Sequence, residues 1–349
     1  MPNVLFTNNC VELSPLKRSI FDVNNNFATN KVAMKYLKLI VLSLSVGFSF
    51  AQEATDTLPK KWKLKSVFGI NGTQSQFVNW NAGGRNNISA IGFINASANY
   101  RGEKLLFQND MSLALGGVKY LGASSSGEIL QKTDDQIQIT SSLGYPFNEK
   151  WSATFMADFK TQFLDGFNYP NDSVRISSFM APGYLNLSVG ADYKPNEHLT
   201  MFYSPVSSKM TFVQDQTLAD QGAFGVKAAE YDATTGELLV AGENFRYELG
   251  SYFRMRYNKE IFKNINLDAK LSLFSNYLDR PENIDVNSDI LFTFKVNSWF
   301  SASLNWSMIY DHDINIMDAS GNIGPRLQFK SVLGVGISYA LQNFEEMKK

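Results

Sequence analysis

The sequence has 349 residues, and its 32 Lys and Arg against 33 Asp and Glu give a formal charge of −1. This balance gives no support to nucleic-acid binding, which depends on a basic surface. Aromatic residues make up 13% of the chain, and no Pro-, Gly- or Ser-rich linker divides it. We therefore expect a single aromatic-rich domain.

Near the N-terminus, a second methionine opens a segment typical of a secretory signal peptide. Lys35 and Lys38 form its basic start, residues 39–48 are apolar, and Ala51 ends a small-residue cleavage site. The apolar run is about half as long as a transmembrane helix requires. The expected order is a leader upstream of the true translation start (residues 1–33), a signal peptide (34–51), a periplasmic N-terminal segment (52–62), a barrel (63–341) and a periplasmic tail (342–349).

The only cysteine, Cys10, lies in the expected leader. The mature chain would then have no thiol, which excludes a disulfide, a cysteine nucleophile and a thiolate metal site.

The rest of the chain alternates apolar and polar residues at period two, as β-strands do. In the clearest segment, Trp151, Phe155 and Phe159 alternate with Thr154 and Asp158, so one face suits lipid and the other water. By this parity Phe155→Arg should impair assembly, and Thr154→Arg should be tolerated if the lumen has room. We expect strands near residues 63–71, 88–100, 105–115, 133–145, 151–163, 181–193, 199–213, 247–257, 265–277, 286–296, 300–310 and 327–339.

The connections between these segments alternate in length. Short turns lie at residues 101–104, 146–150, 194–198, 258–264 and 297–298. Long connections lie at residues 71–87, 118–132, 164–179, 214–245, 279–285 and 311–326. Short periplasmic turns and long extracellular loops give this asymmetry, so the pattern favours an all-β, transmembrane antiparallel up-and-down β-barrel of about 12 strands in the cell outer membrane over the alternative of a soluble β-sandwich.

Aromatic residues beside the short turns share the parity of the apolar faces, and they predict an interfacial girdle at that end. They are Tyr100, Tyr145, Trp151, Tyr193, Tyr257 and Tyr339.

Several strings resemble domain-of-unknown-function family 3078. They are residues 77–84 (FVNWNAGG), 179–185 (FMAPGYL), 204–205 with 209–211, and 222–226 (GAFGV). The resemblance extends along nearly the whole mature chain, and it implies an exported outer-membrane protein of the Bacteroidota. It implies no activity and supplies no catalytic residue.

Neither histidine suggests an enzyme, because a serine hydrolase needs a histidine beside a nucleophile. His198 falls in a short turn. His312 falls in a long loop with Asp311, Asp313 and Asp318, where these groups could ligate a divalent cation or bridge lipopolysaccharide through Ca²⁺. The spacing fits no EF-hand, and we favour ordinary loop acids. We therefore expect no catalytic residue, no metal site and no cofactor.

Two sets of residues are candidates for solute contact. The outer-loop candidates are Asn79, Trp80 and Asn81, which could stack on a sugar ring and bond to its hydroxyls, although a loop folded back for barrel closure is the favoured alternative. The lumen candidates carry both charge signs on the wet faces and are Asp110, Asp158, Lys160, Arg254, Arg256, Asp268 and Lys270. A strongly ion-selective porin would favour one sign.

These features favour a narrow channel or uptake protein for a small polar solute. The alternative is a structural or surface-interaction barrel with a plugged lumen, in which the outer loops do the work. The expected partners are outer-membrane lipid and lipopolysaccharide, the barrel assembly machinery and an unidentified small solute, and no nucleic acid.

Overall fold

A computed structural model describes residues 61–75, 86–121, 130–169, 171–317 and 322–344. The expected leader, the signal peptide, the outer-loop candidates Asn79, Trp80 and Asn81, and Asp318 lie outside these residues. No helix in the described part of the chain is long and apolar enough to cross a membrane.

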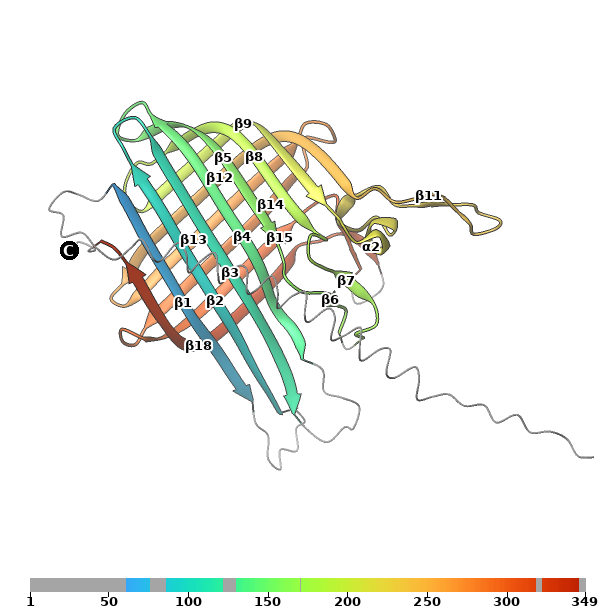
Figure 1. Ribbon diagram of the computed structural model, residues 1–349, viewed down its shortest axis with the longest axis horizontal. Coiled ribbons are helices and arrows are strands. Elements are labelled where there is room, and N and C mark those ends of the chain that lie inside the picture. The colour runs from blue at the N-terminus through green and yellow to red at the C-terminus, as the bar shows by residue number, and fades with distance from the viewer. Residues whose placement is uncertain (1–60, 76–85, 122–129, 170, 318–321, 345–349) are drawn as a thin grey trace, which may run out of the picture. The chain divides into compact units, whose positions relative to one another are not determined.

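The described chain forms a closed antiparallel barrel in which each barrel strand pairs with the next and the first pairs with the last (Figure 1). All 12 expected strands are present, so the predicted fold class is confirmed. The barrel strands are β1 (Trp62–Ser75), β2 (Asn86–Arg101), β3 (Leu106–Leu121), β4 (Gln131–Pro146), β5 (Trp151–Thr161), β8 (Gly183–Tyr193), β9 (Leu199–Phe212), β12 (Phe245–Phe262), β13 (Ile265–Asn276), β14 (Ile284–Lys295), β15 (Phe300–Tyr310) and β18 (Gln328–Gln342).

Three of the short turns share one local device. In each, an asparagine side chain accepts hydrogen bonds from the backbone N–H groups two and three residues further along the chain, at 2.7–3.0 Å. The residues are Asn148, Asn196 and Asn297. Such Asx turns reverse the chain within a few residues and start the next strand. The turn between β12 and β13 instead uses Asn264 at a positive φ of 66°.

The two faces of the barrel wall differ as the alternation predicts. On β5, Trp151 and Phe155 are 44% and 46% exposed, whereas Thr154 and Met156 are 3% and 4% exposed. Leu143 and Val189 pair with Phe155 across the neighbouring strands and are also exposed. Exposed apolar side chains on the outside of a closed barrel form a lipid-facing belt. Thr161 departs from the predicted pattern, because it is buried and its hydroxyl donates to the carbonyl of Pro182.

The aromatic residues beside the short turns contact one another. Trp151 and Tyr193 stack with their ring centroids 4.4 Å apart, and Tyr100 lies 5.3 Å from Trp62. Tyr339 lies 5.7 Å from Phe68 on the adjacent strand. These pairs lie on the outward face near one barrel end, as the predicted girdle requires.

Strand β9 contains a β-bulge at Pro205. Ser207 pairs with Gly250 and Ser204 pairs with Tyr252, so β9 has one more residue than β12 between these pairs. Proline lacks an N–H donor, and a bulge is one of the few places where a sheet accepts it. The Ser204 hydroxyl lies 2.7 Å from the carbonyl oxygen of Val206 and donates within the bulge. The extra residue reverses the inward parity of β9, so residues after the bulge face inward at odd numbers.

The long connections that the structure describes lie at the opposite end of the barrel from the short turns, as predicted. They contain the pairs β6 (Gly166–Phe167) with β7 (Arg175–Ser177), β10 (Glu230–Tyr231) with β11 (Leu238–Val240), and β16 (Asn315–Met317) with β17 (Ile323–Pro325), together with helix α2 (Gln216–Asp220) and the 3-10 turn η1 (Ala223–Gly225).

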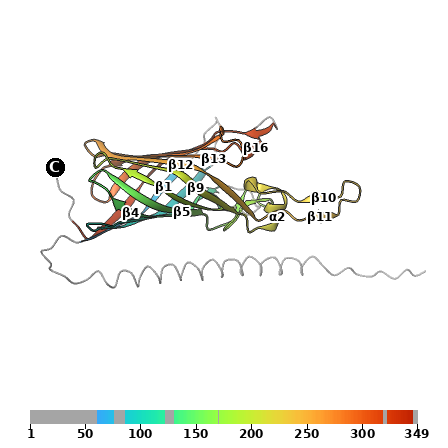
Figure 2. The same cartoon turned by 90° about the horizontal axis from the view of Figure 1, so that it is seen from above.

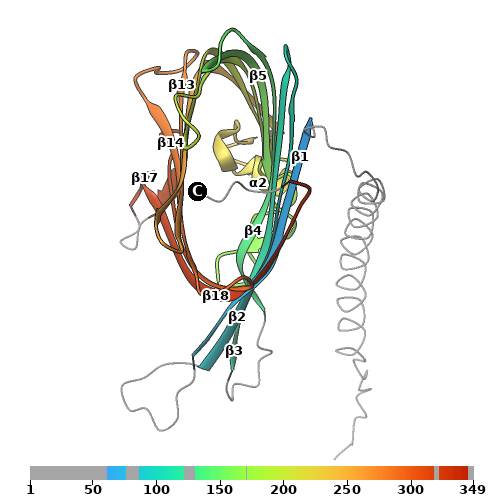
Figure 3. The ribbon, with the colours of Figure 1, turned by 90° about the vertical axis from the view of Figure 1, so that its left-hand side faces the viewer.

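Helix α2 belongs to a small folded unit, which we call the outer cap. Ala181, Val213, Leu218, Ala219 and Val226 are buried together in it. The side chain of Asp215 accepts hydrogen bonds from two N–H groups in the first turn of α2 and starts the helix. Figures 1 and 2 place α2 beyond the ends of β8 and β9, and Figure 3 shows it across the barrel opening.

The hairpin of β10 and β11 projects away from the barrel at this end (Figures 1 and 2). Its turn is built by Asp232, whose side chain accepts hydrogen bonds from the N–H groups of Thr235 and Thr234, both at 2.8 Å. These backbone bonds hold the pKa of Asp232 below its usual 3.8. The bonds persist above the usual carboxylate pKa and are lost as the pH falls through the lowered value.

Candidate functional site

The lumen has one tightly packed wall. In the described residues, the buried inward-facing side chains lie only on β4, β5, β8, β9, β12 and β13. They are Thr140, Ser152, Thr154, Met156, Ser188, Phe202, Ser204, Ser207, Thr211, Glu248, Tyr252, Phe274 and Asn276. Figure 3 shows an elongated barrel cross-section with β5 and β13 near one narrow end and β18 near the other. Inward side chains crowd where the wall curves sharply.

The rest of the lumen remains open to solvent. Asn95 on β2, Gln108 on β3, and Asn287 and Asp289 on β14 have inward parity but are exposed. The inward side chains of β15, among them Asn305, are half-buried. Water therefore reaches the inside of the barrel beside these strands.

An apolar cluster forms the centre of the packed wall. Met156, Phe202, Tyr252 and Phe274 are buried in mutual contact, one each from β5, β9, β12 and β13. Phe202 and Tyr252 have ring centroids 6.3 Å apart. Sequence reasoning missed this cluster, although a signal was available. Its members lie on the same strand faces as polar residues such as Asp158 and Arg254. Large apolar side chains on a wet face indicate contact across a lumen.

All seven predicted lumen residues have inward parity in the strand register. Arg256 forms a bidentate ion pair with Asp268, in which its Nε and Nη2 donate to the two carboxylate oxygens at 3.0 and 2.8 Å. Asp158 instead accepts hydrogen bonds from Thr140 at 2.5 Å and Gln138 at 3.3 Å. Opposite charges therefore pair at Arg256 and Asp268, and the role of all seven residues in solute contact stays a prediction.

Three of the seven line a small cavity of about 90 Å³ in the lumen. They are Asp110, Arg254 and Arg256. The same cavity is lined by Asp192 and by two members of the apolar cluster, Met156 and Phe202, with the polar residues Gln108, Thr140, Ser142 and Thr200 completing it. Charges of both signs thus face one confined space beside the apolar cluster.

At the outer end of the lumen, Lys209 holds the centre of an ion-pair network. Its Nζ lies 3.5 Å from Glu248, 2.7 Å from Asp285 and 3.6 Å from Asp311. The same Nζ lies 5.1 Å from the centre of the Phe274 ring. Lys209 therefore links β9 to β12, to β14 and to the connection that follows β15.

A second cation extends this network. Arg246 on β12 pairs with Glu248 at 3.1 Å and with Asp313 in the connection after β15. Asn276 on β13 donates to Glu248, at 3.4 Å. Glu248 is only 1% exposed, and a carboxylate at such depth needs these partners to offset the loss of hydration.

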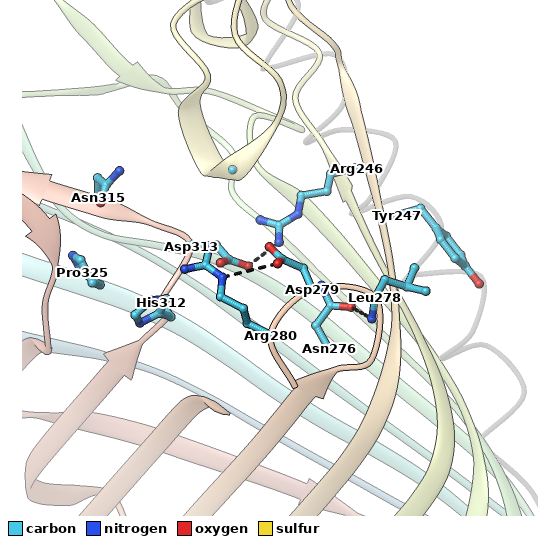
Figure 4. Close-up of a pocket in the computed structure, with 11 residues that line it drawn as sticks. Arg246, Tyr247, Asn276, Leu278, Asp279, Arg280, His312, Asp313, Asn315 and Pro325 are labelled. Atoms are coloured by element: carbon cyan, nitrogen blue, oxygen red, sulfur yellow. Dashed lines mark hydrogen bonds and ion pairs between the residues drawn. The ribbon is translucent and has the colours of Figure 1, made fainter. Parts of the chain in front are cut away.

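Next to this network, and sharing Arg246 and Asp313 with it, the mouth contains a polar pocket of about 490 Å³ (Figure 4). Arg246 and Asp313 form its inner side, and Arg280 with Asp279 comes from the connection between β13 and β14. His312, Asn315 and Pro325 come from the connection between β15 and β18. Gly225 comes from the connection between β9 and β12. The three connections therefore form a hydrophilic entrance above the lumen.

The two histidines lie at opposite ends of the barrel. His198 lies in the short turn before β9, where its Nδ1 is 3.1 Å from the carbonyl oxygen of Asn258. His312 lies at the outer mouth, 3.3 Å from the Tyr310 hydroxyl. Asp311 and Asp313 beside it pair with Lys209 and Arg246. No group of possible metal ligands is present among the described residues.

Comparison with family models tests the resemblance in the sequence. Residues 73–167 match the model of Protein of unknown function (DUF3078). The resemblance to DUF3078 is thereby confirmed, over a shorter stretch than the near-complete mature chain expected from the sequence strings. Residues 211–316 match a second model, Protein of unknown function, DUF481. No curated protein matches the chain.

Three solved structures are similar to this protein at low sequence identity. The COG4313 outer membrane channel from Pseudomonas putida F1 has 13% identity and a TM-score of 0.36, covering 83% of this chain and 99% of that one. The translocator domain of the autotransporter NalP from Neisseria meningitidis has 10% identity and a TM-score of 0.34, covering 90% and 97%. A NanC porin has 7% identity and a TM-score of 0.33, covering 79% and 98%. These low scores carry no argument about mechanism.

The architecture of the barrel indicates where in the cell the protein is located. A closed antiparallel barrel of 12 strands, with exposed apolar residues on its outer face and an aromatic girdle beside its short turns, is an outer-membrane β-barrel. The protein is located in the outer membrane.

Proposed function

We propose that this protein is a narrow, water-filled channel for small polar solutes. The observation that carries the proposal is the exposure of inward-facing polar residues such as Gln108, Asn287 and Asp289 inside a closed barrel. A lumen packed shut would bury these side chains. The apolar cluster and the ion pairs occupy the other part of the lumen, so the passage is narrow.

The charges of the lumen support small polar solutes over a single class of ion. Asp110, Asp158 and Asp289 share the lumen with Arg254 and Lys270, and no sign dominates. Strong ion selectivity requires a ring of one sign. We propose no enzymatic activity, catalytic residue or cofactor.

Single-channel recording of the purified protein in a planar bilayer tests this proposal. We expect small or intermittent conductance, and we expect the double variant Arg254→Ala with Arg256→Ala to increase it, because two long side chains leave the narrowest part of the lumen. Lys295→Ala, which removes a lumen-facing charge at the short-turn end, is the matched control and should leave the conductance near the wild-type value. Large, steady wild-type currents would contradict a narrow passage, and silent membranes would contradict a channel.

A surface-interaction barrel remains the second candidate, and the β10–β11 hairpin supports it. Tyr231, Leu238, Leu239 and Val240 are exposed next to one another on this projecting hairpin, and adjoining exposed apolar residues are candidates for protein contact. In either case, we propose that outer-membrane lipid and lipopolysaccharide surround the barrel, and that the barrel assembly machinery inserts it.

Cysteine labelling on intact cells tests whether this hairpin is presented outside. Since Cys10 is the only cysteine of the chain, a thiol introduced by Thr234→Cys reports the hairpin turn. A membrane-impermeant maleimide should label it on intact cells. Glu149→Cys, in the short turn between β4 and β5, should be labelled only after the outer membrane is permeabilised. The reverse pattern would contradict the orientation, and the surface-interaction candidate with it.

A further inference from the structure

Two opposite charges on the small lumen cavity form no ion pair within the described chain, although Asp192 acts on Arg254 and Arg256 on Asp110 at longer range. Arg254 has no carboxylate at ion-pair distance, and its Nη1 donates only to the Met156 sulfur, at 3.4 Å. Thioether sulfur is a weak acceptor. Asp110 lies on β3, separated from Arg254 on β12 by β4, β5, β8 and β9, and it makes no side-chain hydrogen bond or ion pair within the described residues.

The other charged groups of this cavity are already engaged. Arg256 is held by Asp268 through two hydrogen bonds. Asp192 accepts a hydrogen bond from Thr154, at 2.7 Å. The cavity charges with neither an ion pair nor a hydrogen bond to a nitrogen or oxygen atom are therefore the guanidinium of Arg254 and the carboxylate of Asp110, and the Asp192 carboxylate acts on Arg254 only at longer range.

The space suits a very small molecule. A cavity of about 90 Å³ has room for about six water positions, at roughly 15 Å³ of probe volume for each. Met156 and Phe202 form an apolar side, while Gln108 and Thr200 offer polar atoms on the lining. A solute of a few non-hydrogen atoms fits these limits.

The two free charges define the class of that solute. A guanidinium binds a carboxylate through two parallel hydrogen bonds, and the carboxylate of Asp110 attracts an ammonium group. An anion alone would be repelled by Asp110, and a cation alone by Arg254. We propose that this cavity selects small zwitterions of the amino-acid type, with the solute carboxylate at Arg254 and its ammonium group at Asp110. This inference rests on the proposed channel.

Two isomers provide a sharp test. Glycine and glycolamide have the same atoms and nearly the same size, but only glycine is a zwitterion at neutral pH, and neither carries net charge across a membrane. Swelling of liposomes that contain the full protein measures the entry of each. We expect glycine to enter about fivefold faster than glycolamide, from one favourable charge pair in a partly desolvated site.

Charge-removing variants assign the preference to the two residues. Arg254→Gln and Asp110→Asn should each bring the glycine-to-glycolamide ratio close to one. Lys295→Gln removes a charge outside the cavity and should keep the wild-type ratio. A folded barrel and heat-unfolded protein migrate differently in detergent gels, so this difference identifies the variants that fold, and only those are compared.

The outcomes separate this inference from the channel itself. Equal entry of the two isomers through the wild type would overturn zwitterion selection and leave the channel standing. A wild-type preference that survives in both folded variants would overturn the assignment to Arg254 and Asp110. Entry of neither isomer would contradict the proposed channel.

Discussion

Replacing Lys209 with methionine should destabilise the barrel by about 3–5 kcal/mol, the usual cost of removing one partner from a buried ion pair. Without Lys209, Asp285 and Asp311 lose their cation, and Glu248 keeps a single cationic partner, Arg246. The connection after β15 would lose one of its attachments to the wall. Urea unfolding of the protein refolded in lipid vesicles, followed by tryptophan fluorescence, measures this change.

Two further variants make the Lys209 experiment decisive. Lys227→Met removes an exposed lysine of the outer loop that pairs with Glu230, and it should leave the unfolding midpoint unchanged. Combining Lys209→Met with Glu248→Gln removes a charge that would otherwise remain underpaired, so the double variant should lose less stability than the two single losses added together. Additive losses, or a wild-type midpoint for Lys209→Met, would show that the network does not support the barrel.

Arginine in place of Phe155 should cost about 2–4 kcal/mol, because this side chain faces the lipid near the middle of β5. Its cross-strand neighbours Leu143 and Val189 are also exposed and apolar, so no acid is near enough to pair with the new charge. We expect a reduced yield of folded protein in outer membranes and a lower unfolding midpoint in vesicles.

The matched control for Phe155 must face the lumen and have room. Thr154 faces the lumen but has no room, since it is 3% exposed and bonded to Asp192. The sequence-based expectation made tolerance of arginine depend on room in the lumen, and that condition is not met. Gln138 faces the lumen, is half-buried and already contacts Asp158, which would pair with a new arginine. Gln138→Arg should assemble almost normally, and equal yields for Phe155→Arg and Gln138→Arg would contradict the assignment of the two faces.

The sequence by itself determined the number of strands, the end at which the long connections lie, and the face of most side chains. Period-two alternation is a local property, because successive side chains of any strand point to opposite faces. The parity of Trp151 and Phe155 on β5, and of Arg254 and Arg256 on β12, could therefore be predicted without any knowledge of the neighbours. The Asn residues of the short turns also act locally, because each Asx turn involves only the next two or three residues.

Only the tertiary structure decided how the lumen is filled. The bulge at Pro205 reverses the parity of β9, so simple alternation from Phe202 would place Lys209 on the lipid side, whereas it lies inside with Glu248 and Asp285. A bulge depends on pairing with the adjacent strands, and the sequence of one strand alone does not specify that pairing. Likewise, Asp311 pairs with Lys209 only because barrel closure brings together groups about one hundred residues apart in the sequence.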